Sequence, residues 1–193
     1  FNGKKILLPT NVTGIQHASL LESILGLALT IRGTEVSYLI CDGMMPACQK
    51  LATGNTPDVQ TIIDYKLNQS LCAGCMKAGL KYAQATGLKC HLYSEFISER
   101  ELQYCKEISS AIAVQSIKEF KHNGMAIGEH AWAGMLRYYA RGDINHDSNA
   151  GIVARRYLEA SLVTEHVVSN LLNNHKFDAL CFHHGIYVPQ GTT

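Results

Sequence analysis

One pair of the seven cysteines, Cys72 and Cys75, has the C-x-x-C spacing typical of metal-binding or redox sites, and two more lie in a loop that could approach it. Cys41 and Cys48 bound the sequence CDGMMPAC, and Cys72 and Cys75 form the pair in CAGC. Four thiolates can hold zinc or an iron–sulfur cluster. A single close pair is a weak signal, so we favour the interpretation that these cysteines are buried free thiols that pack as small apolar residues.

A second group of polar residues fills the loop before the first expected helix. The loop TNVTGIQ contains Asn11, Thr13 and Gly14, and His17 follows it directly. An imidazole at a helix start can accept a proton from a substrate hydroxyl, because its ordinary pKa lies near neutral pH. Judged by spacing alone, His17 more often caps the helix or fills space beside it. The loop lacks the G-x-G-x-x-G and P-loop patterns, which disfavours nicotinamide- or flavin-dependent dehydrogenases and P-loop NTPases.

Later segments carry further candidate binding residues. Asp42 follows an expected strand, and the sequence HHGIY contains His184, Gly185 and Tyr187. Adjacent side chains on a strand point to opposite faces, so one histidine of this pair serves a given ligand. We expect it to be His184, with closure of the strand as its alternative role. Glu129 precedes the single tryptophan, so this segment either lines a groove in which an aromatic ring stacks on a sugar or anchors a short helix in the core.

The beginning of the chain predicts a β-α-β unit. Residues 4–9 form an apolar run closed by a proline, residues 17–32 are rich in helix formers, and residues 35–40 form a second apolar run. Gly33 stands where a helix-ending glycine is expected. Apolar residues cover most of the circumference of the expected helix, so we expect it to be packed between other elements.

The rest of the chain continues the alternation of helices and strands. A loop is expected over residues 41–64, and Ser98 with Glu101 matches a capping box that starts a helix. The further expected elements are a helix over 73–86 that Gly87 ends, helices over 99–120, 129–140 and 149–174, and strands over 89–93 and 179–183.

Strands separated by helices predict an α/β fold with a mostly parallel, Rossmann-like sheet covered by helices on both faces. In such sheets ligands bind beyond the carboxyl ends of the strands. The loop that ends at His17, the turn at Asp42 and the segment at His184 all follow strands, so we expect them to meet at one edge. No helix follows the last expected strand, which predicts a truncated chain.

The composition excludes several classes of protein. Of the 193 residues, 47% are hydrophobic and 17% are charged, and the formal net charge is +1. A nearly neutral chain has no electrostatic signature for nucleic acid or an anionic membrane, and no stretch approaches the roughly 18 apolar residues of a membrane span. The odd number of scattered cysteines predicts reduced thiols and a cytoplasmic protein.

Several motifs together resemble a known superfamily. The segment ILLPTNVTGIQHASLLESILGLALTIRGTEVSYLI resembles the opening of GT-B type glycosyltransferases, in which a strand, a glycine-containing loop and a helix lead through an RG-x-EV step into the second strand. CDGMMPAC, CAGC and HHGIYVPQG are similar to bacterial capsule and surface-polysaccharide biosynthesis proteins of that superfamily. This ordered series of motifs covers nearly the whole chain.

The resemblance implies an enzyme with two Rossmann-like halves. Residues 1–193 would be the N-terminal half, which mainly binds the acceptor, and the C-terminal half, which binds the sugar nucleotide, would be absent from this chain. Several inverting members use a histidine of the first loop as general base, and His17 is the matching position. Here Gly14 precedes His17 by three residues, whereas those members have glycine directly before the histidine.

Three hypotheses follow for the function. The first is the acceptor-side domain of a glycosyltransferase that moves a sugar from a nucleotide sugar to a polysaccharide or lipid-linked acceptor, with no cofactor and no activity without its second half. The second is a non-catalytic α/β module that binds a small ligand or a metal through Cys48, Cys72 and Cys75. The third is an assembly partner whose apolar patch drives self-association.

Overall fold

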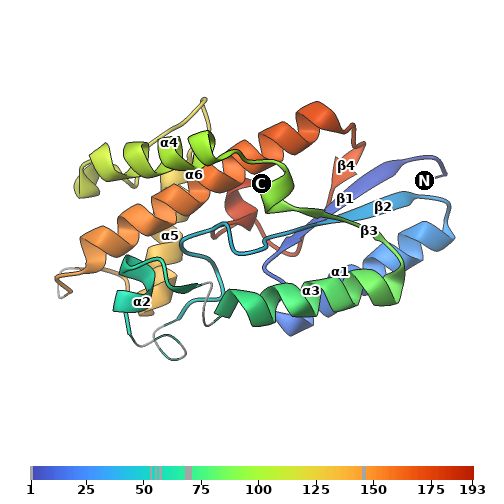
Figure 1. Ribbon diagram of the computed structural model, residues 1–193, viewed down its shortest axis with the longest axis horizontal. Coiled ribbons are helices and arrows are strands. Elements are labelled where there is room, and N and C mark those ends of the chain that lie inside the picture. The colour runs from blue at the N-terminus through green and yellow to red at the C-terminus, as the bar shows by residue number, and fades with distance from the viewer. Residues whose placement is uncertain (1, 53, 55, 57, 68–70, 145–146) are drawn as a thin grey trace.

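The computed structural model describes residues 2–52, 54, 56, 58–67, 71–144 and 147–193, and the structural statements below concern these residues. A parallel sheet lies at one end of the molecule, and a group of helices lies beyond the end at which its strands finish (Figure 1). The sheet has the order β3-β2-β1-β4, and each neighbouring pair is parallel. Its strands are β1 (Lys5–Asn11), β2 (Glu35–Ile40), β3 (Lys89–Leu92) and β4 (Ala179–Leu180).

Helices and short 3-10 turns connect the strands. The helices are α1 (Gln16–Ile31), α2 (Gln60–Ile63), α3 (Ala73–Thr86), α4 (Glu99–Ala111), α5 (Ile127–Tyr139) and α6 (Ala150–Asn174). The 3-10 turns are η2 (Tyr93–Glu95), η3 (Val114–Ser116) and η4 (Gln190–Thr192). No described helix is both long enough and apolar enough to cross a bilayer.

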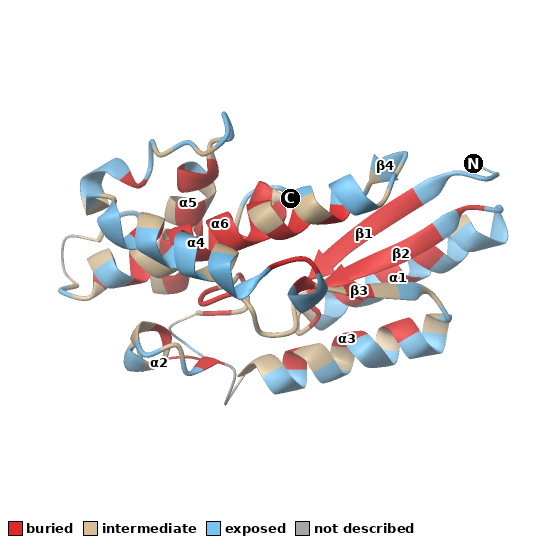
Figure 2. Ribbon diagram, turned by 45° about the horizontal axis from the view of Figure 1, so that its top comes forward, coloured by how far each residue is buried: buried red, intermediate tan, exposed pale blue. Residues whose placement is uncertain are grey.

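Both faces of the sheet are covered, which confirms the predicted α/β, Rossmann-like fold. Ile6 and Leu8 of β1 belong to the core on the side of α1 and α3, whereas Leu7 belongs to the larger core formed with α5 and α6. Successive strand residues point to opposite faces, so β1 supplies side chains to both cores. Figure 2 shows the buried strands β1 and β2 with α6 on one side and α3 on the other.

The local start and stop signals predicted from the sequence are present. The Ser98 hydroxyl accepts a hydrogen bond from the Glu101 N–H at 3.3 Å, and the Glu101 carboxylate accepts one from the Ser98 N–H at 2.8 Å, which completes the capping box of α4. Gly87 ends α3 in the left-handed conformation, with φ of 68°. Both signals act within a few residues, so the sequence alone suffices to predict them.

The expectation that the first helix is packed between other elements is wrong. The side of α1 that faces the sheet carries small and polar residues, among them Ser19, Ser23 and Gly26, and a Cβ on Gly26 would press against Leu8. Small residues let the helix approach the sheet closely, and the large apolar residues are therefore left on the outer side. The exposed large residues of α1 are Leu20, Leu21, Ile24, Leu27 and Ile31.

Three expected boundaries also differ. Strand β1 continues through Pro9 to Asn11, with an irregular register between Leu8 and Asn11 where proline offers no N–H to the ladder. The helix expected over residues 99–120 ends at Ala111, and the next carbonyl, of Ile112, accepts a hydrogen bond from Arg155 of α6 instead.

The last strand is shorter than expected, and the loop over residues 41–64 contains the unpredicted helix α2. Only Ala179 and Leu180 pair with β1.

Candidate functional site

Polar residues that follow β1, β2 and β3 lie at the carboxyl edge of the sheet. Asn11 ends β1, and its side-chain oxygen accepts a hydrogen bond from the Tyr93 hydroxyl, beyond β3, at 2.9 Å. Asp42, beyond β2, accepts hydrogen bonds from the Ser94 hydroxyl at 2.5 Å and from the Ser94 N–H at 3.2 Å. Asn11 and Asp42 are thus held by hydrogen bonds to the protein, and they connect the ends of β1 and β2 to the residues that follow β3.

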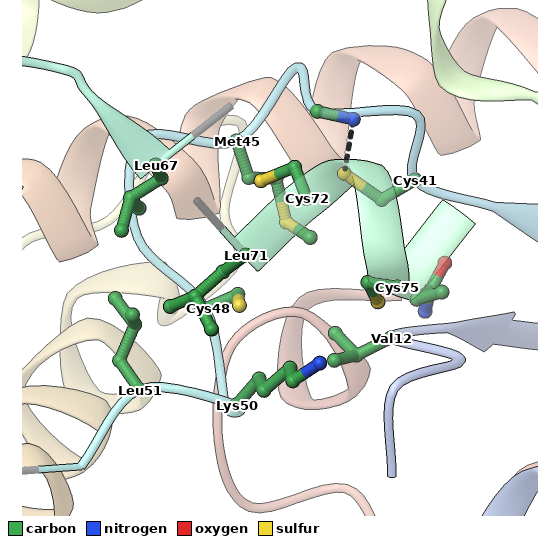
Figure 3. Close-up of a pocket in the computed structure, with 12 residues that line it drawn as sticks. Val12, Cys41, Met45, Cys48, Lys50, Leu51, Leu67, Leu71, Cys72 and Cys75 are labelled. Atoms are coloured by element: carbon green, nitrogen blue, oxygen red, sulfur yellow. Dashed lines mark hydrogen bonds between the residues drawn. The ribbon is translucent and has the colours of Figure 1, made fainter. Parts of the chain in front are cut away.

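The same edge carries a narrow pocket into which four cysteines converge. Cys41 and Cys48 come from the segment after β2, Cys72 directly precedes α3, and Cys75 lies in its first turn. Figure 3 shows the four side chains around this pocket together with Lys50. The free volume is about 20 Å³, which is little more than one water molecule needs. The remaining lining residues are Asn11, Val12, Gly43, Met45, Leu51, Leu67 and Leu71.

Backbone N–H groups point at the sulfur atoms of this pocket. The Gly14 N–H donates to Cys75 Sγ at 3.0 Å, and the Gly43 N–H donates to Cys41 Sγ at 3.4 Å. Burial raises the pKa of Cys48, and one backbone hydrogen bond, from Lys50, acts in the opposite direction. Donors aimed at sulfur stabilise the thiolate relative to the thiol, because thiolate is the stronger acceptor.

The loop before α1 contacts Cys75 and lies beside Lys50, both of which line this pocket. The Thr13 hydroxyl donates to the Cys75 carbonyl at 2.5 Å. A Cβ on Gly14 would overlap the side chain of Lys50, so glycine is needed at this position for the lysine to lie against the loop. Burial raises the pKa of Cys72, and the positive charge of Lys50 offsets part of that rise. Thr13 and Gly14, expected as substrate-binding residues, therefore lie beside cysteines.

Burial dominates the acidity of Cys41, Cys48 and Cys72 when no metal is bound. It raises the pKa of Cys41 to about 12 and the pKa of Cys48 well above its ordinary value, and it raises the pKa of Cys72 in the same direction. A nucleophilic or redox-active cysteine needs a lowered pKa, so these thiols are not poised for such chemistry. A bound cation would reverse the balance, because coordinated thiols lose their protons.

The spacing of the sulfur atoms bears on what they can hold. A tetrahedral zinc site with Zn–S bonds of about 2.3 Å places the sulfur atoms roughly 3.8 Å apart. No three of these sulfur atoms all lie within 4.8 Å of one another; among the described residues, His122, Glu165 and His166 have ligand atoms that do. The four sulfur atoms are thus spread more widely than a single zinc ion requires.

The expected catalytic residue His17 lies away from this pocket. It is exposed in the first turn of α1, and it is not among the residues that line the cysteine pocket. Its role as a general base remains a prediction.

A histidine–glutamate pair lies where the order of the strands changes direction. The order β3-β2-β1-β4 places this switch point between β1 and β4, the usual position of a ligand crevice in such sheets. Glu22 of α1 lies 2.9 Å from His183 Nδ1 through Oε1 and is almost fully buried. Neither His183 Nε2 nor Glu22 Oε2 has a hydrogen-bond partner among the described residues, although both are buried. Sequence reasoning missed Glu22, whose only signal is that it is the one acidic residue in α1.

The neighbouring residues of the last segment pack against α5. The Ile186 N–H donates to His184 Nδ1 at 3.3 Å, and burial lowers the pKa of His184. The Tyr187 ring lies under the Arg137 guanidinium, 5.4 Å from ring centre to Cζ. A Cβ on Gly185 would be in ordinary contact with Phe182.

Glu129 is exposed in the first turn of α5, and Trp132 packs partly buried against the larger core. The position of Trp132 agrees with the interpretation of this segment as a core anchor. Comparison of the chain with family models, with curated proteins and with solved structures finds no match.

Proposed function

We propose that this chain is a cluster-binding α/β domain in which Cys41, Cys48, Cys72 and Cys75 hold an iron–sulfur cluster. The observation that carries the proposal is the convergence of the four cysteines on one pocket from two separate segments of the chain. The pocket lies at the sheet edge where α/β proteins bind their ligands. Reduced thiols of this kind suit the cytoplasm.

The surroundings of the sulfur atoms support a charged thiolate cluster. Four thiolates around iron carry net negative charge, and hydrogen bonds to sulfur help to stabilise that charge. Gly14 and Gly43 supply such bonds from the backbone, and Lys50 lies beside them with a positive charge. The wide spacing of the sulfur atoms favours a polynuclear cluster over one ion.

Anaerobic reconstitution with iron and sulfide tests this proposal. We expect the chain to bind iron and acid-labile sulfide in equal amounts, with the visible absorption of an iron–sulfur cluster. Cys72→Ser should lose most of the bound iron, whereas Cys181→Ser, which changes an exposed cysteine outside the pocket, should keep it. A chain that binds no iron, or that binds one zinc ion and no iron, would contradict the cluster.

A second candidate function is the acceptor-side domain of a glycosyltransferase, and the pair of Glu22 and His183 favours it. In this mechanism the Glu22 carboxylate orients the imidazole through Nδ1. His183 Nε2 removes the proton of an acceptor hydroxyl while the hydroxyl oxygen attacks the anomeric carbon of a nucleotide sugar, and the nucleoside diphosphate departs with the bonding electrons. The partners would be a sugar nucleotide and a carbohydrate or lipid-linked acceptor.

Turnover of a nucleotide sugar by the full-length protein separates the two histidines. If His183 is the base, His183→Gln lowers kcat by roughly 10²- to 10⁴-fold, and His17→Gln leaves it nearly unchanged. The reverse result would assign the proton transfer to His17. Equal, undiminished turnover in both variants would exclude both histidines.

A further inference from the structure

A second group of ligand-type side chains lies between α4, α6 and the turn that precedes α5. His122, Glu165 and His166 each offer one ligand atom, and these atoms all lie within 4.8 Å of one another. Glu165 and His166 are neighbours on α6. No part of this group belongs to the cysteine pocket.

The turn that carries His122 is held in one conformation. The backbone groups of His122 and Met125 bond to each other in both directions, at 3.0 and 2.9 Å. Asn123 and Gly124 between them have φ of 48° and 81°, the positive values that Asn-Gly turns adopt readily. A fixed turn presents the imidazole to α6 with little freedom to lose on binding.

The distances between the three groups suit a small cation. His122 Nδ1 lies 2.9 Å from Glu165 Oε2, and His166 Nε2 lies 4.0 Å from the same oxygen. The Glu165 side chain is 3% exposed, so its carboxylate is largely removed from water. A buried carboxylate beside two imidazoles is a donor set that zinc and other divalent transition metals accept.

In each of the two imidazoles, the ring nitrogen that would not bind the metal lies near another polar side chain. His122 Nε2 lies 3.3 Å from the Tyr104 hydroxyl, and His166 Nδ1 lies 3.8 Å from Glu101 Oε1. A metal ion would replace the hydrogen bond between His122 Nδ1 and Glu165 Oε2, and the proton of each imidazole would then lie on the nitrogen that faces Tyr104 or Glu101. Outer partners of this kind orient histidine ligands in metal sites.

The remaining atoms complete this arrangement. Asn123 Nδ2 donates to Glu165 Oε1 at 2.8 Å, so that Oε2 is the carboxylate oxygen that faces the two imidazoles. His166 Nε2 is buried and has no hydrogen-bond partner in the described part of the chain. An unpaired buried nitrogen is costly, and a metal ion would satisfy it.

We propose that His122, Glu165 and His166 form a mononuclear site for a divalent transition metal of the zinc class. The side chains of His122 and His166 are 15% and 21% exposed, so the site lies near the surface. Three protein ligands leave one position of a tetrahedral ion for water or a small ligand. The site is independent of the cysteine pocket, so the chain has two separate places for metals.

Cobalt(II) tests this proposal, because its spectrum distinguishes sulfur from nitrogen and oxygen ligands. The full chain should bind one Co²⁺ whose visible bands lack a sulfur-to-cobalt charge transfer, and Cys72→Ser should keep this ion. His166→Gln and Glu165→Gln should each weaken its binding at least about tenfold, and Tyr104→Phe, which removes one outer partner, should weaken it by about 10- to 100-fold. His17→Gln, which changes an exposed histidine on α1, is the matched control and should bind as the unchanged chain does.

Two results would overturn the site. One is that the chain binds no Co²⁺ through nitrogen and oxygen ligands at Co²⁺ concentrations up to about a millimolar. The other is equal binding by the His17→Gln, His166→Gln and Tyr104→Phe variants. Circular dichroism shows whether each variant is folded, and Tyr104→Phe decides the matter if a ligand variant unfolds, because it removes one partly exposed hydroxyl. Loss of the cysteine cluster alone leaves this proposal intact, since the two spectra are distinct.

Discussion

Histidines of this protein lie in surroundings that differ in burial and charge, and these surroundings decide what each imidazole can do. His17 is exposed to water, whereas His183 faces a buried carboxylate. His91 of β3 is buried among the rings of Phe96, His175 and Phe177. The same residue type therefore supports a solvated side chain, a candidate base and a core residue in one chain.

His91 should make the stability of the protein depend on pH. Burial, followed by the charges of Lys89 and His175, lowers the pKa of His91 from its ordinary 6.5. The unfolded chain then binds a proton that the folded chain refuses, so the free energy of unfolding falls as the pH drops through about 6.5. Urea unfolding at about pH 7.5 and pH 5.5 should show a smaller fall in His91→Phe than in the unchanged chain. His17→Gln is the control and should show the same fall as the unchanged chain. If the free energy of unfolding falls equally in His91→Phe and in the unchanged chain, His91 does not cause the pH dependence.

At the scale of elements, the start of α5 depends on a close approach of two backbones. The Gly128 N–H donates to the Phe120 carbonyl at 3.0 Å. A Cβ on Gly128 would collide with the carbonyl oxygens of Ile117 and Phe120. Backbone atoms cannot rotate away as the end of a side chain can, so the helix and the preceding turn would have to separate.

Gly128→Ala should therefore destabilise the protein by about 1–3 kcal/mol, although alanine favours a helix by about 1 kcal/mol over glycine. Gly142→Ala is the matched control, because no heavy atom lies within 4 Å of its added Cβ. Urea unfolding of the two variants measures the difference. A Gly128→Ala chain as stable as the control would show that α5 can shift without loss.

At the scale of the whole molecule, one hydrophobic core joins the sheet to the helices beyond it. Leu7 of β1 is fully buried in the same core as residues of α5 and α6, and Trp132 of α5 packs against that core. The Tyr157 hydroxyl of α6 donates to the Cys48 carbonyl at 3.2 Å, which ties the long helix to the cysteine segment. A shared core predicts that sheet and helices unfold together.

Leu7→Ala should lower the free energy of unfolding by about 2–5 kcal/mol and shift every probe equally. Trp132, the only tryptophan, reports on α5, and far-ultraviolet circular dichroism reports on all the helices and strands. Ile31→Ala is the control, because the Ile31 side chain is 86% exposed, and its effect should stay within about 0.5 kcal/mol. A shift in circular dichroism without a shift in Trp132 fluorescence would mean that the helices unfold separately.

Some residues of the candidate sites could be predicted from their spacing in the sequence, and others could not. The sequence singled out Cys41, Cys48, Cys72 and Cys75 as two separate segments, and the structure brings them into one pocket. The sequence contains no signal for the pairing of Glu22 with His183, because the two residues are 161 positions apart. Such a pairing depends on the path of the chain between the two residues, which spacing does not encode.

The sequence by itself determined the order and type of most elements, the parallel sheet and the ends of helices at Ser98 and Gly87. These features arise from periodicity, capping and turn conformation, which act over a few residues. Three features depend on tertiary contacts and could not be predicted. Helix α1 turns its large apolar residues outward, and the helix expected over 99–120 ends at Ala111. Two histidines also lie beside one buried glutamate, Glu165. Those outcomes rest on contacts between distant segments, where the closest packing prevails over local preference.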